Sequence, residues 1–539
     1  MKFEEKLRKQ TPEQLWQEYC GFLDLSMDAY MRIQQHLLME QVQLLSASRL
    51  GRGLLGNNIP GSTEEFRATV PLTTYEDYAD TLLMRREEDL PAKPLVWLET
   101  TWEGGDYPRK TAPYSLSMLN TYRHNLLGAL LLANSREKGR FFVRPHAKAL
   151  YALAPLPYAT GLFPELMKSE LDMQFIPPLK EAVALPFSQQ MSRGFELALK
   201  GGMHQFFGMS SILFHISRNL LDSGGTRRLS LKGFSPGMLF RLLRARGKAR
   251  DRGTPMLPKD LFDLDAFVCV GNDSALYKPE LERCWGIRPM EIVGGTEPSL
   301  IGTETWSRDG LVLYPDACFY EFIPEREMNR SLEDPAYVPR TFLMNELSPH
   351  QLYEMVITVL KGGSFVRYRV GDVYRCLRLR NAKDGLELPQ FEFVDRVPTV
   401  IDIGGFTRIT QREVLKVLEL SRLQVAGWTA LKEYDDEKHA YLQMFIELEE
   451  GEAGLPSSAE IIKDHLSVYF RYYDQDYGSL KKLIKVDPLR VNIVPAGSFR
   501  RFRERNGYPL RSINPPSADV VDFRGISGLD RKGGVNAWQ

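Results

Sequence analysis

The chain carries the stretch Ser-Phe-Val-Arg-Tyr-Arg-Val-Gly-Asp-Val at residues 364–373. Its apolar and β-branched residues predict a strand, Gly371 predicts a tight turn, and a second strand is expected from Tyr374 onward. The turn then places the carboxylate of Asp372 at a strand end. An ionised carboxylate accepts several hydrogen bonds from hydroxyl groups, so Asp372 is a candidate for binding two vicinal hydroxyls, as in ribose. The alternative is an ordinary turn with an acidic residue.

Size and charge limit the classes of function. A chain of 539 residues exceeds one compact core, so two or more domains are expected. Lys plus Arg equals Asp plus Glu, at 69 each, which gives no global electrostatic case for binding nucleic acid or a membrane. The basic stretch at residues 241–252 is interpreted as a solvated helix end and loop.

Cysteine usage and hydropathy indicate the compartment. The five cysteines show no CxxC spacing, which argues against structural zinc and disulfides and favours a reducing compartment. The N-terminal residues MKFEEKLRKQ lack the apolar core of a signal peptide. The most apolar stretch, residues 126–133, falls far short of the ~20 residues needed to span a bilayer. We therefore expect a cytoplasmic protein with no nucleic-acid or membrane partner; the oligomeric state stays open.

The hydrophobic pattern predicts the fold class. Residues 12–49 have helical periodicity, 51–61 are expected as loop and 75–87 as helix. From about residue 95 short apolar runs alternate with amphipathic segments, which indicates an α/β sheet covered on both faces. From about 311 strand follows strand, as in an antiparallel subdomain. Near 396 the pattern becomes that of a small α+β unit with a partly extended tail from Asn514.

We therefore predict an α/β protein with two domains. Residues 1–395 would form a large N-terminal domain of mixed sheets, covering helices and an antiparallel β subdomain, and residues 396–539 a small α+β domain. About 140 residues are enough for that second domain to fold alone.

A second motif, Ile-Val-Gly-Gly-Thr-Glu at residues 292–297, ends a predicted strand. The two glycines would let a flat ring or a phosphate approach the backbone closely. The carboxylate of Glu297 is a candidate ligand for Mg²⁺, which prefers one or two protein carboxylates together with phosphate oxygens. The alternative is a strand-to-loop turn with an exposed Glu.

Two further segments contain candidate polar groups. A predicted strand at 391–394 delivers Asp395 and Arg396 at the expected domain boundary, where Arg396 could donate to ribose or phosphate and Asp395 could lie in a hinge. The alternative is a surface ion pair of little energetic value. Residues 98–110 combine hydroxyls, paired glycines and a Lys after a strand, a composition suited to binding a triphosphate. However, Glu103 and Asp106 would place negative charge close to the negative charge of the phosphates.

The order of these motifs resembles the acyl-adenylate-forming superfamily and, within it, the auxin-responsive Gretchen Hagen family of acyl acid amido synthetases. The resemblance spans most of the chain. Its specific parts are Glu-Phe-Ile-Pro at 321–324 and Arg-Tyr-Arg-Val-Gly-Asp at 367–372. Further matching stretches are residues 70–78, 389–393 and 495–499.

The resemblance implies a two-step ligase. A carboxylic acid attacks the α-phosphate of ATP to give an acyl-adenylate and pyrophosphate, and an amino acid then displaces AMP. Such a site works by positioning reactants and neutralising developing charge. The small C-terminal domain of the family rotates between the two steps. ATP and Mg²⁺ are the implied cofactors, and a small carboxylic acid and an amino acid the implied partners.

By position, the resemblance assigns roles to individual residues. Glu297 would bind Mg²⁺ as a catalytic group and Asp372 would bind the ribose, while Tyr368 and Arg396 would line the nucleotide.

Four more positions complete the implied nucleotide site. Thr100 and Thr101 would lie in the phosphate loop, with Gly295 and Thr296 near the adenine and the carboxylate.

The sequence also departs from the family pattern. Trp102 and Glu103 interrupt the phosphate loop, Arg408 replaces the lysine after the hinge, and Ile513 takes the place of the C-terminal catalytic lysine. Arg511 is the candidate catalytic replacement, with Arg501 and Lys532 as alternatives. Two other functions therefore stay open: a degenerate protein that binds a nucleotide or acyl ligand without turnover, and an acyl-CoA ligase.

Overall fold

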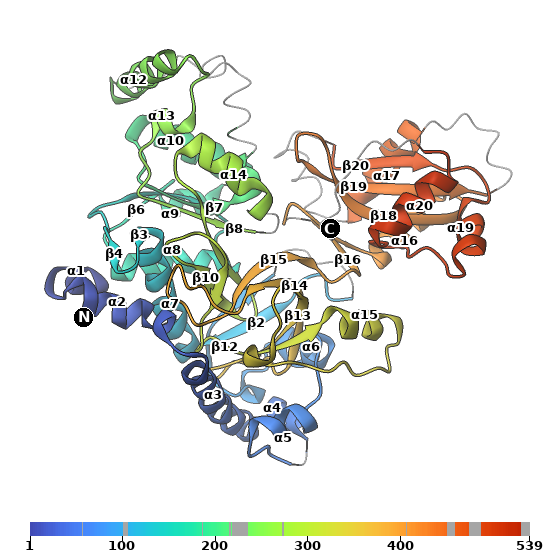
Figure 1. Ribbon diagram of the computed structural model, residues 1–539, viewed down its shortest axis with the longest axis horizontal. Helices are drawn as coiled ribbons and strands as arrows, with labels where there is room; N and C mark the ends of the chain where they lie inside the picture. Colours follow the sequence, from blue (N-terminus) through green and yellow to red (C-terminus); the bar gives the residue numbers. More distant parts are fainter. Residues whose placement is uncertain are drawn as a thin grey trace. The chain divides into compact units, whose positions relative to one another are not determined.

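A computed structural model of the chain describes residues 1–56, 58–100, 106–185, 187–214, 217, 236–271, 274–405, 407–449, 459–473 and 487–529 (Figure 1). The chain divides into two compact units. Unit 1 comprises Met1–Thr100 and Lys110–Phe393, and unit 2 comprises Thr101–Arg109 and Val394–Gln539. Residues 101–109, which the sequence assigned to the first domain, thus group with the second unit.

Unit 1 is built on one mixed sheet, in the strand order β12-β13-β14-β15-β11-β10-β9-β8-β7-β5-β6. The strands are β5 (Lys148–Ala152), β6 (Gln174–Ile176), β7 (Gln205–Met209), β8 (Ala266–Val270), β9 (Met290–Gly295), β10 (Ser299–Glu304), β11 (Leu311–Leu313), β12 (Cys318–Pro324), β13 (Leu352–Val359), β14 (Tyr368–Arg378) and β15 (Gln390–Arg396). Strand β9 pairs parallel with β8 and antiparallel with β10. The predicted α/β and antiparallel regions are therefore two halves of one sheet that join at β9, and the predicted fold class is confirmed.

Smaller strands and many helices complete unit 1 (Figure 1). The additional strands are β1 (Pro94–Glu99), β2 (Thr111–Ser115), β3 (Ser135–Glu137) and β4 (Arg140–Phe141). The α-helices are α1 (Phe3–Lys9), α2 (Pro12–Cys20), α3 (Met27–Ala47), α4 (Arg49–Leu55), α5 (Thr63–Thr69), α6 (Glu76–Leu82), α7 (Leu116–Ala133), α8 (Leu162–Glu170), α9 (Leu179–Ala184), α10 (Phe187–Gly201), α12 (Pro236–Arg252), α13 (Pro258–Leu261), α14 (Ser274–Trp285) and α15 (Glu325–Glu333). Short 3-10 turns lie at Gly21–Asp24, Glu87–Asp89, Ala159–Gly161 and Met344–Glu346.

Helix α7 shows how the sequence sets these elements. The Ser115 hydroxyl accepts the Met118 N–H and begins the helix, as N-cap residues do. At the other end the buried Arg308 donates to the carbonyls of Leu132, Ala133 and Ser135. The last carbonyls of a helix have no partners within it, so this guanidinium closes the C-terminal end.

The hairpin predicted at Gly371 is wrong. Residues Tyr368–Arg378 form one continuous strand, β14, along β13. Glu354 of β13 pairs with Val373 and Val356 pairs with Arg369, so three residues of β14 oppose one residue of β13. Gly371 has φ +79° and lies in this bulge. Asp372 is therefore presented by a β-bulge in mid-strand instead of by a turn at a strand end.

Three other local predictions need correction. Helix α4 extends to Leu55, into the predicted loop at 51–61, and the helix predicted over 75–87 ends at Leu82. The tail from Asn514, predicted as partly extended, contains a helix that was not predicted, Ser517–Ile526.

Unit 2 is a three-layer α+β unit. Its elements are β16 (Val400–Ile403), β17 (Thr407–Thr410), α16 (Gln411–Ser421), β18 (Val425–Tyr434), β19 (Ala440–Leu448), α17 (Ala459–Tyr473), β20 (Leu489–Ile493), α19 (Ser498–Asn506) and α20 (Ser517–Ile526). Strands β18, β19 and β20 form one sheet. One of its faces packs in a core with α16 and α17, and the other packs with α19 and α20.

Candidate functional site

The two motifs that best define the resemblance contact each other in unit 1. The guanidinium of Arg367 donates from Nε and Nη2 to the two carboxylate oxygens of Glu321, at 2.9 and 2.8 Å. Both side chains are buried, and Nη1 of Arg367 also donates to the carbonyls of Arg67 and Val70. A bidentate pair of this kind fixes the angle between two segments as well as their distance. Arg367 and Glu321 therefore act as a structural clamp.

The matching stretch at 70–78 joins the same strand. Thr73 donates its N–H to the Arg367 carbonyl and accepts the Arg369 N–H, at 3.0 and 2.9 Å. The hydroxyls of Thr73 and Tyr78 both donate to the carbonyl of Val366. Three stretches that lie far apart in the sequence thus converge on the beginning of β14.

Glu297 lies in the turn between β9 and β10. Gly295 pairs with Ser299 across this hairpin, and a side-chain carbon at Gly294 would lie 2.2 Å from the Ser299 carbonyl oxygen. A larger residue at Gly294 would collide with the backbone of β10, so the hairpin itself requires this glycine. The turn is also held from β2, because the Tyr114 hydroxyl donates to the Thr296 carbonyl at 2.8 Å.

Glu297 belongs to a buried polar chain that includes a cation. The Tyr368 hydroxyl donates to Glu297 Oε1 at 3.1 Å, and Lys110 Nζ donates to the Tyr368 hydroxyl at 3.3 Å. Thr100 is buried and donates its N–H to the Lys110 carbonyl at 2.9 Å, and the Lys110 N–H donates to the Thr100 hydroxyl at 3.0 Å. We call Thr100, Lys110, Glu297 and Tyr368 the Lys110 cluster.

Aromatic side chains surround the Lys110 cluster. The Lys110 ammonium lies 5.6 Å from the centre of the Tyr75 ring, and the Tyr75 hydroxyl accepts the N–H of Thr111 at 2.7 Å. Burial raises the pKa of Tyr75 and of Tyr114, and the nearby Glu297 carboxylate adds to the rise. Both phenols therefore remain neutral and act as hydrogen-bond groups. The cluster lies beyond the carboxyl end of β9, the edge at which α/β sheets bind ligands.

The cluster presents one carboxylate to a divalent ion. Within the described ranges, no group of three His, Cys, Asp or Glu side chains is placed to hold a metal. A single carboxylate near a lysine ammonium fits Mg²⁺ that arrives with a nucleotide, because Mg²⁺ takes its other ligands from phosphates and water. Glu297 is the residue that would hold it.

Asp372 lies on the same strand as Tyr368, four residues further along. At the rise of an extended strand this is at most ~13 Å. Its side chain is half-buried, and the bulge at Gly371 turns this part of β14 out of its ladder with β13. Gly295 and Thr296 lie beside Glu297 in the hairpin.

Asp395 and Arg396 lie at the end of β15, in unit 2. The Asp395 carboxylate forms an ion pair with Lys432 Nζ of β18 at 2.8 Å, and both side chains are only 4% exposed. It also accepts the Arg396 N–H at 2.8 Å. The alternative of an exposed surface pair is therefore wrong for Asp395.

Arg408 lies on the hairpin of β16 and β17. Its Nε donates to the buried carboxylate of Asp402 at 3.2 Å, and burial lowers the pKa of Arg408 to about 10. The guanidinium is still protonated at neutral pH. Asp402 also accepts the N–H of Gly405 at 2.7 Å, which stabilises the turn of the hairpin.

The C-terminal candidates differ in exposure. Ile513 is buried in the core of unit 2 and bridges to Ala430 of β18. Arg511 is half-buried, and its carbonyl accepts the Thr429 hydroxyl. Arg501 donates to Ala496 and Ser498 at the start of its own helix. Thr101 and Lys532 lie outside the described residues.

Lys110 was noted within the segment 98–110, but the residue-by-residue assignment gave it no role. It ends the segment 98–110, whose acidic residues argued against a phosphate loop. One of these, Asp106, forms an ion pair with Arg412 within unit 2. A Lys directly before a short strand was the available signal.

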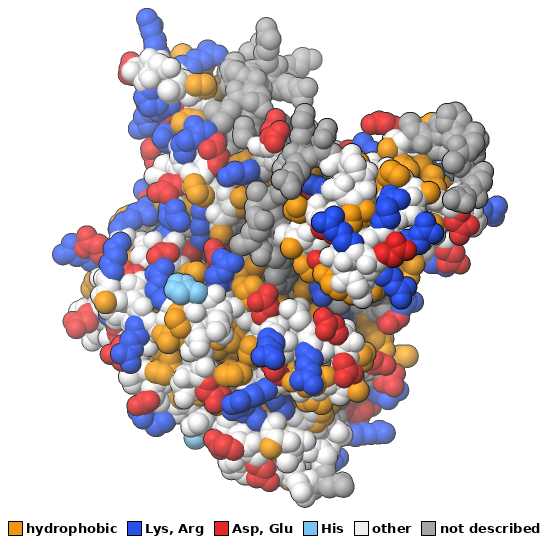
Figure 2. Space-filling view, turned by 45° about the vertical axis from the view of Figure 1, so that its right-hand side comes forward, with side chains coloured by type: hydrophobic (Ala, Val, Ile, Leu, Met, Phe, Trp, Pro, Cys, Tyr) orange, Lys and Arg blue, Asp and Glu red, His pale blue; other side chains and the backbone are white. Residues whose placement is uncertain are grey.

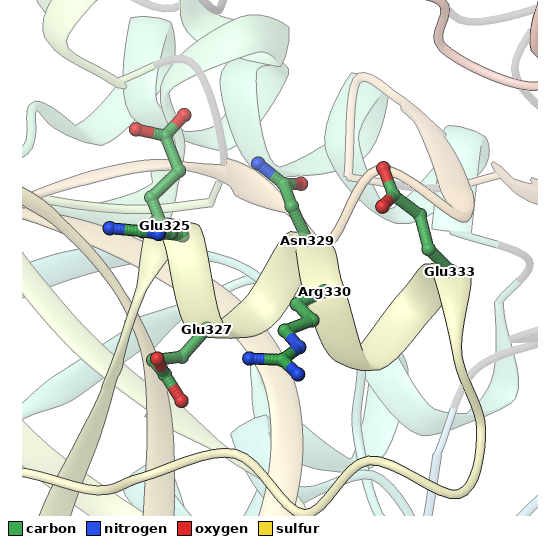
Figure 3. Close-up of a pocket in the computed structure, with 6 residues that line it drawn as sticks. Glu325, Glu327, Asn329, Arg330 and Glu333 are labelled. Carbon is green, nitrogen blue, oxygen red and sulfur yellow. The ribbon is translucent and has the colours of Figure 1, made fainter.

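A surface hollow of about 680 Å³ lies along α15 and is separate from the Lys110 cluster. In Figure 3, Glu325, Asn329 and Glu333 project to one side of the helix, while Glu327 and Arg330 project to the other. Glu327 accepts the Tyr337 hydroxyl, and Arg330 stacks on the Tyr337 ring at 3.9 Å. Glu327 and Arg330 therefore hold Tyr337 against the helix.

Comparison with known proteins identifies a family domain and a fold. Residues 311–396 match the GH3 family central domain. The chain carries a GH3 family domain and the fold of the adenylate-forming enzymes. The resemblance inferred from the sequence motifs is thereby confirmed.

Two curated relatives match over 236 residues each. The GH3 domain-containing protein of Mus musculus is 26% identical, and the match covers 41% of this chain and 40% of the relative. The probable indole-3-acetic acid-amido synthetase GH3.1 of Oryza sativa subsp. japonica is 25% identical, and the match covers 39% of this chain and 36% of the relative. The match therefore spans about two fifths of the length of these GH3 relatives.

Solved structures match nearly the whole length. The AtGH3.15 acyl acid amido synthetase in complex with 2,4-DB has a TM-score of 0.53 at 17% identity, covering 96% of both chains. The 2-hydroxyisobutyryl-CoA ligase in complex with 2-HIB-AMP and CoA has a TM-score of 0.53 at 15% identity, covering 86% of this chain and 85% of the other. At these identities the likeness is one of fold. Separately, none of the helices in the described ranges is long and apolar enough to cross a membrane.

Proposed function

We propose that this GH3-type chain activates a carboxylic acid with ATP and transfers the acyl group to the amine of an amino acid. A carboxylate oxygen attacks the α-phosphorus of ATP, and pyrophosphate leaves. The amine nitrogen then attacks the acyl carbon, loses a proton, and AMP leaves. The observation that carries this proposal is the Lys110 cluster, which holds a cation, a phenol and a carboxylate together at the carboxyl end of β9.

The residue roles in this proposal follow from charge. Lys110 stabilises negative charge on the phosphates, and Glu297 holds the Mg²⁺ that accompanies them. Mg²⁺, when bound, neutralises the leaving pyrophosphate. Tyr368 fixes the distance between the cation and the carboxylate. Asp372 accepts hydrogen bonds from the ribose.

Unit 2 supplies the remaining groups of the proposal. Arg396 contacts the nucleotide, and Arg408 and Arg511 are the candidate catalytic cations. The C-terminal domain, with the predicted boundary at 395/396, moves between the two steps. The five cysteines are free and buried, which suits a reducing compartment, and we place the reaction in the cytoplasm.

The relatives support the chemistry through their names. The rice relative is a probable amido synthetase, and AtGH3.15 is an acyl acid amido synthetase. The 2-hydroxyisobutyryl-CoA ligase, which has CoA as its second ligand, shares the fold equally well. The acceptor, amine or thiol, is therefore part of what the assay must decide.

One observation favours a second function, binding without turnover. Ile513, which takes the place of the family's catalytic lysine, is packed in the core of unit 2 at 4% exposure. A core position offers no cation to the α-phosphate. In this second function the chain binds a nucleotide or an acyl ligand and does not react.

Pyrophosphate release from ATP separates these functions. The purified chain is incubated with Mg²⁺, ATP and each member of a panel of carboxylic acids, first alone, then with the twenty amino acids, then with CoA. The proposal predicts acid-dependent pyrophosphate release and an amide product with one amino acid. A thioester product would establish the CoA ligase, and ATP-induced thermal stabilisation without release for any acid would establish binding without turnover.

A further inference from the structure

Helix α12 of unit 1 exposes apolar side chains to solvent. It packs on α10 and α13 through Met238, Leu242, Ala245 and Ala249, which are buried. On the opposite face Leu239, Phe240 and Leu243 are exposed by 51%, 67% and 58%. At 100° per residue these three side chains span about a quarter of the helix circumference, so they form one stripe along its first two turns.

The helix as a whole is strongly basic. Residues 236–252 contain six Lys and Arg and one Asp, a net charge of +5, in a chain whose total is zero. Two of these basic side chains form ion pairs with the following segment, Arg252 with Asp260 and Arg244 with Asp263. Figure 2 shows blue and orange side chains gathered at the end of unit 1 that α12 occupies in Figure 1.

We propose that the exposed face of α12 binds the surface of a membrane that contains anionic lipids. The stripe of Leu239, Phe240 and Leu243 would enter the boundary between headgroups and acyl chains, and Lys248 and Arg250 would contact the anionic headgroups. Amphipathic helices with Phe and Leu beside Lys and Arg bind membrane interfaces in this way. Each basic side chain near an anionic leaflet adds to the attraction.

The shape of the surface favours a lipid over a protein partner. A protein that buried these three side chains would need a complementary groove around a convex helix, whereas a lipid surface adapts to it. The stripe also argues against nucleic acid, because phosphate contacts leave exposed apolar side chains unburied. The expectation of no membrane contact rested on the chain's zero total charge, which averages out this local surplus. The inference does not depend on the proposed enzyme activity.

Vesicle sedimentation tests the inference on the full chain. Vesicles of phosphatidylcholine with 30 mol% phosphatidylserine are compared with pure phosphatidylcholine at low and high salt. We expect the chain to sediment with the anionic vesicles, at least tenfold less with neutral ones, and less at high salt because ions screen surface charge. The triple variant Leu239→Ser, Phe240→Ser, Leu243→Ser is expected to lose at least tenfold in partitioning, and Lys248→Glu with Arg250→Glu a similar amount.

A matched control separates the stripe from general surface hydrophobicity. Val468 and Val521 are exposed apolar residues of unit 2, at 55% and 49%, and Val468→Ser with Val521→Ser should leave sedimentation unchanged. Circular dichroism verifies that each variant is folded. Equal sedimentation of wild type and the triple Ser variant would overturn the inference. A second result would also overturn the inference: wild type does not sediment with vesicles, and wild type and the triple Ser variant bind heparin equally. That result would identify a polyanion site.

Discussion

The clamp between Arg367 and Glu321 gives a prediction whose size follows from the structure. Arg367→Met removes the cation from a carboxylate that is only 1% exposed. Breaking a buried pair by removing one partner costs ~3–5 kcal/mol of unfolding free energy, because a charge stays buried without compensation. Arg67 Nε lies 3.6 Å from the same carboxylate and compensates part of that charge. We therefore expect a loss of ~3 kcal/mol.

Two further variants test the cause of that loss. Adding Glu321→Gln to Arg367→Met removes the uncompensated charge and keeps an acceptor for Thr341, so ~1–2 kcal/mol should return. Recovery stays incomplete because the carbonyls of Arg67 and Val70 lose their donor. Arg369→Met is the matched control. Arg369 forms a similar bidentate pair with Glu354, which is 2% exposed, but Arg369 itself is 20% exposed. Water can therefore enter the space that Arg369 leaves and solvate Glu354, and we expect a loss of ~1–2 kcal/mol.

Hydrogen exchange in increasing urea, measured on peptides from β12 to β14, reports this stability for unit 1 alone. A loss below 1 kcal/mol for Arg367→Met would refute the clamp. A double variant no more stable than the single one would refute the buried-charge explanation.

Three more predictions follow from other groups. Burial beside Glu304 raises the pKa of Glu291 to about 7 from an ordinary 4.5, despite an ion pair with Lys278 at 3.1 Å. The folded state then holds a proton that the unfolded state releases, so the stability of unit 1 should fall by roughly 1–3 kcal/mol between pH 4.5 and 7.5, and Glu291→Gln should abolish that fall in urea titrations at stepped pH. A flat profile for wild type would contradict this. Arg308→Met should cost ~2–4 kcal/mol, because it leaves the carbonyls at the end of α7 without donors; exchange in peptides of α7 measures it, and unchanged protection would contradict it. Tyr368→Phe should weaken ATP·Mg²⁺ binding at least tenfold in calorimetry. Tyr337→Phe, which removes a hydroxyl that contacts α15, is the control. Equal affinities of wild type and Tyr368→Phe for ATP·Mg²⁺ would remove Tyr368 from the site.

The sequence predicted the architecture because periodicity is a local property. It failed at Gly371, because a glycine with positive φ suits a hairpin turn and a β-bulge equally. Only the pairing of β14 with β13, which is long-range, decides between them. Helix α20 was missed because Pro515 and Pro516 suggested extended chain, whereas Pro516 directly precedes the helix and Val520 and Phe523 anchor it in the core.

The candidate site shows the same division. The motifs located Glu297 and Tyr368, and the structure joins them through a hydrogen bond. The role of Arg367 was hidden, since its partner Glu321 lies 46 residues away in sequence. The role of Lys110 was hidden because it depends on contact with Tyr368, from a strand more than 250 residues later.

A crystal structure of the chain grown with ATP, Mg²⁺ and no acid substrate tests the central claim most directly. The account predicts phosphates at the Lys110 ammonium, Mg²⁺ on the Glu297 carboxylate and the ribose hydroxyls on Asp372. Nucleotide density elsewhere, or density that leaves Glu297 and Asp372 without contact to it, would contradict the account.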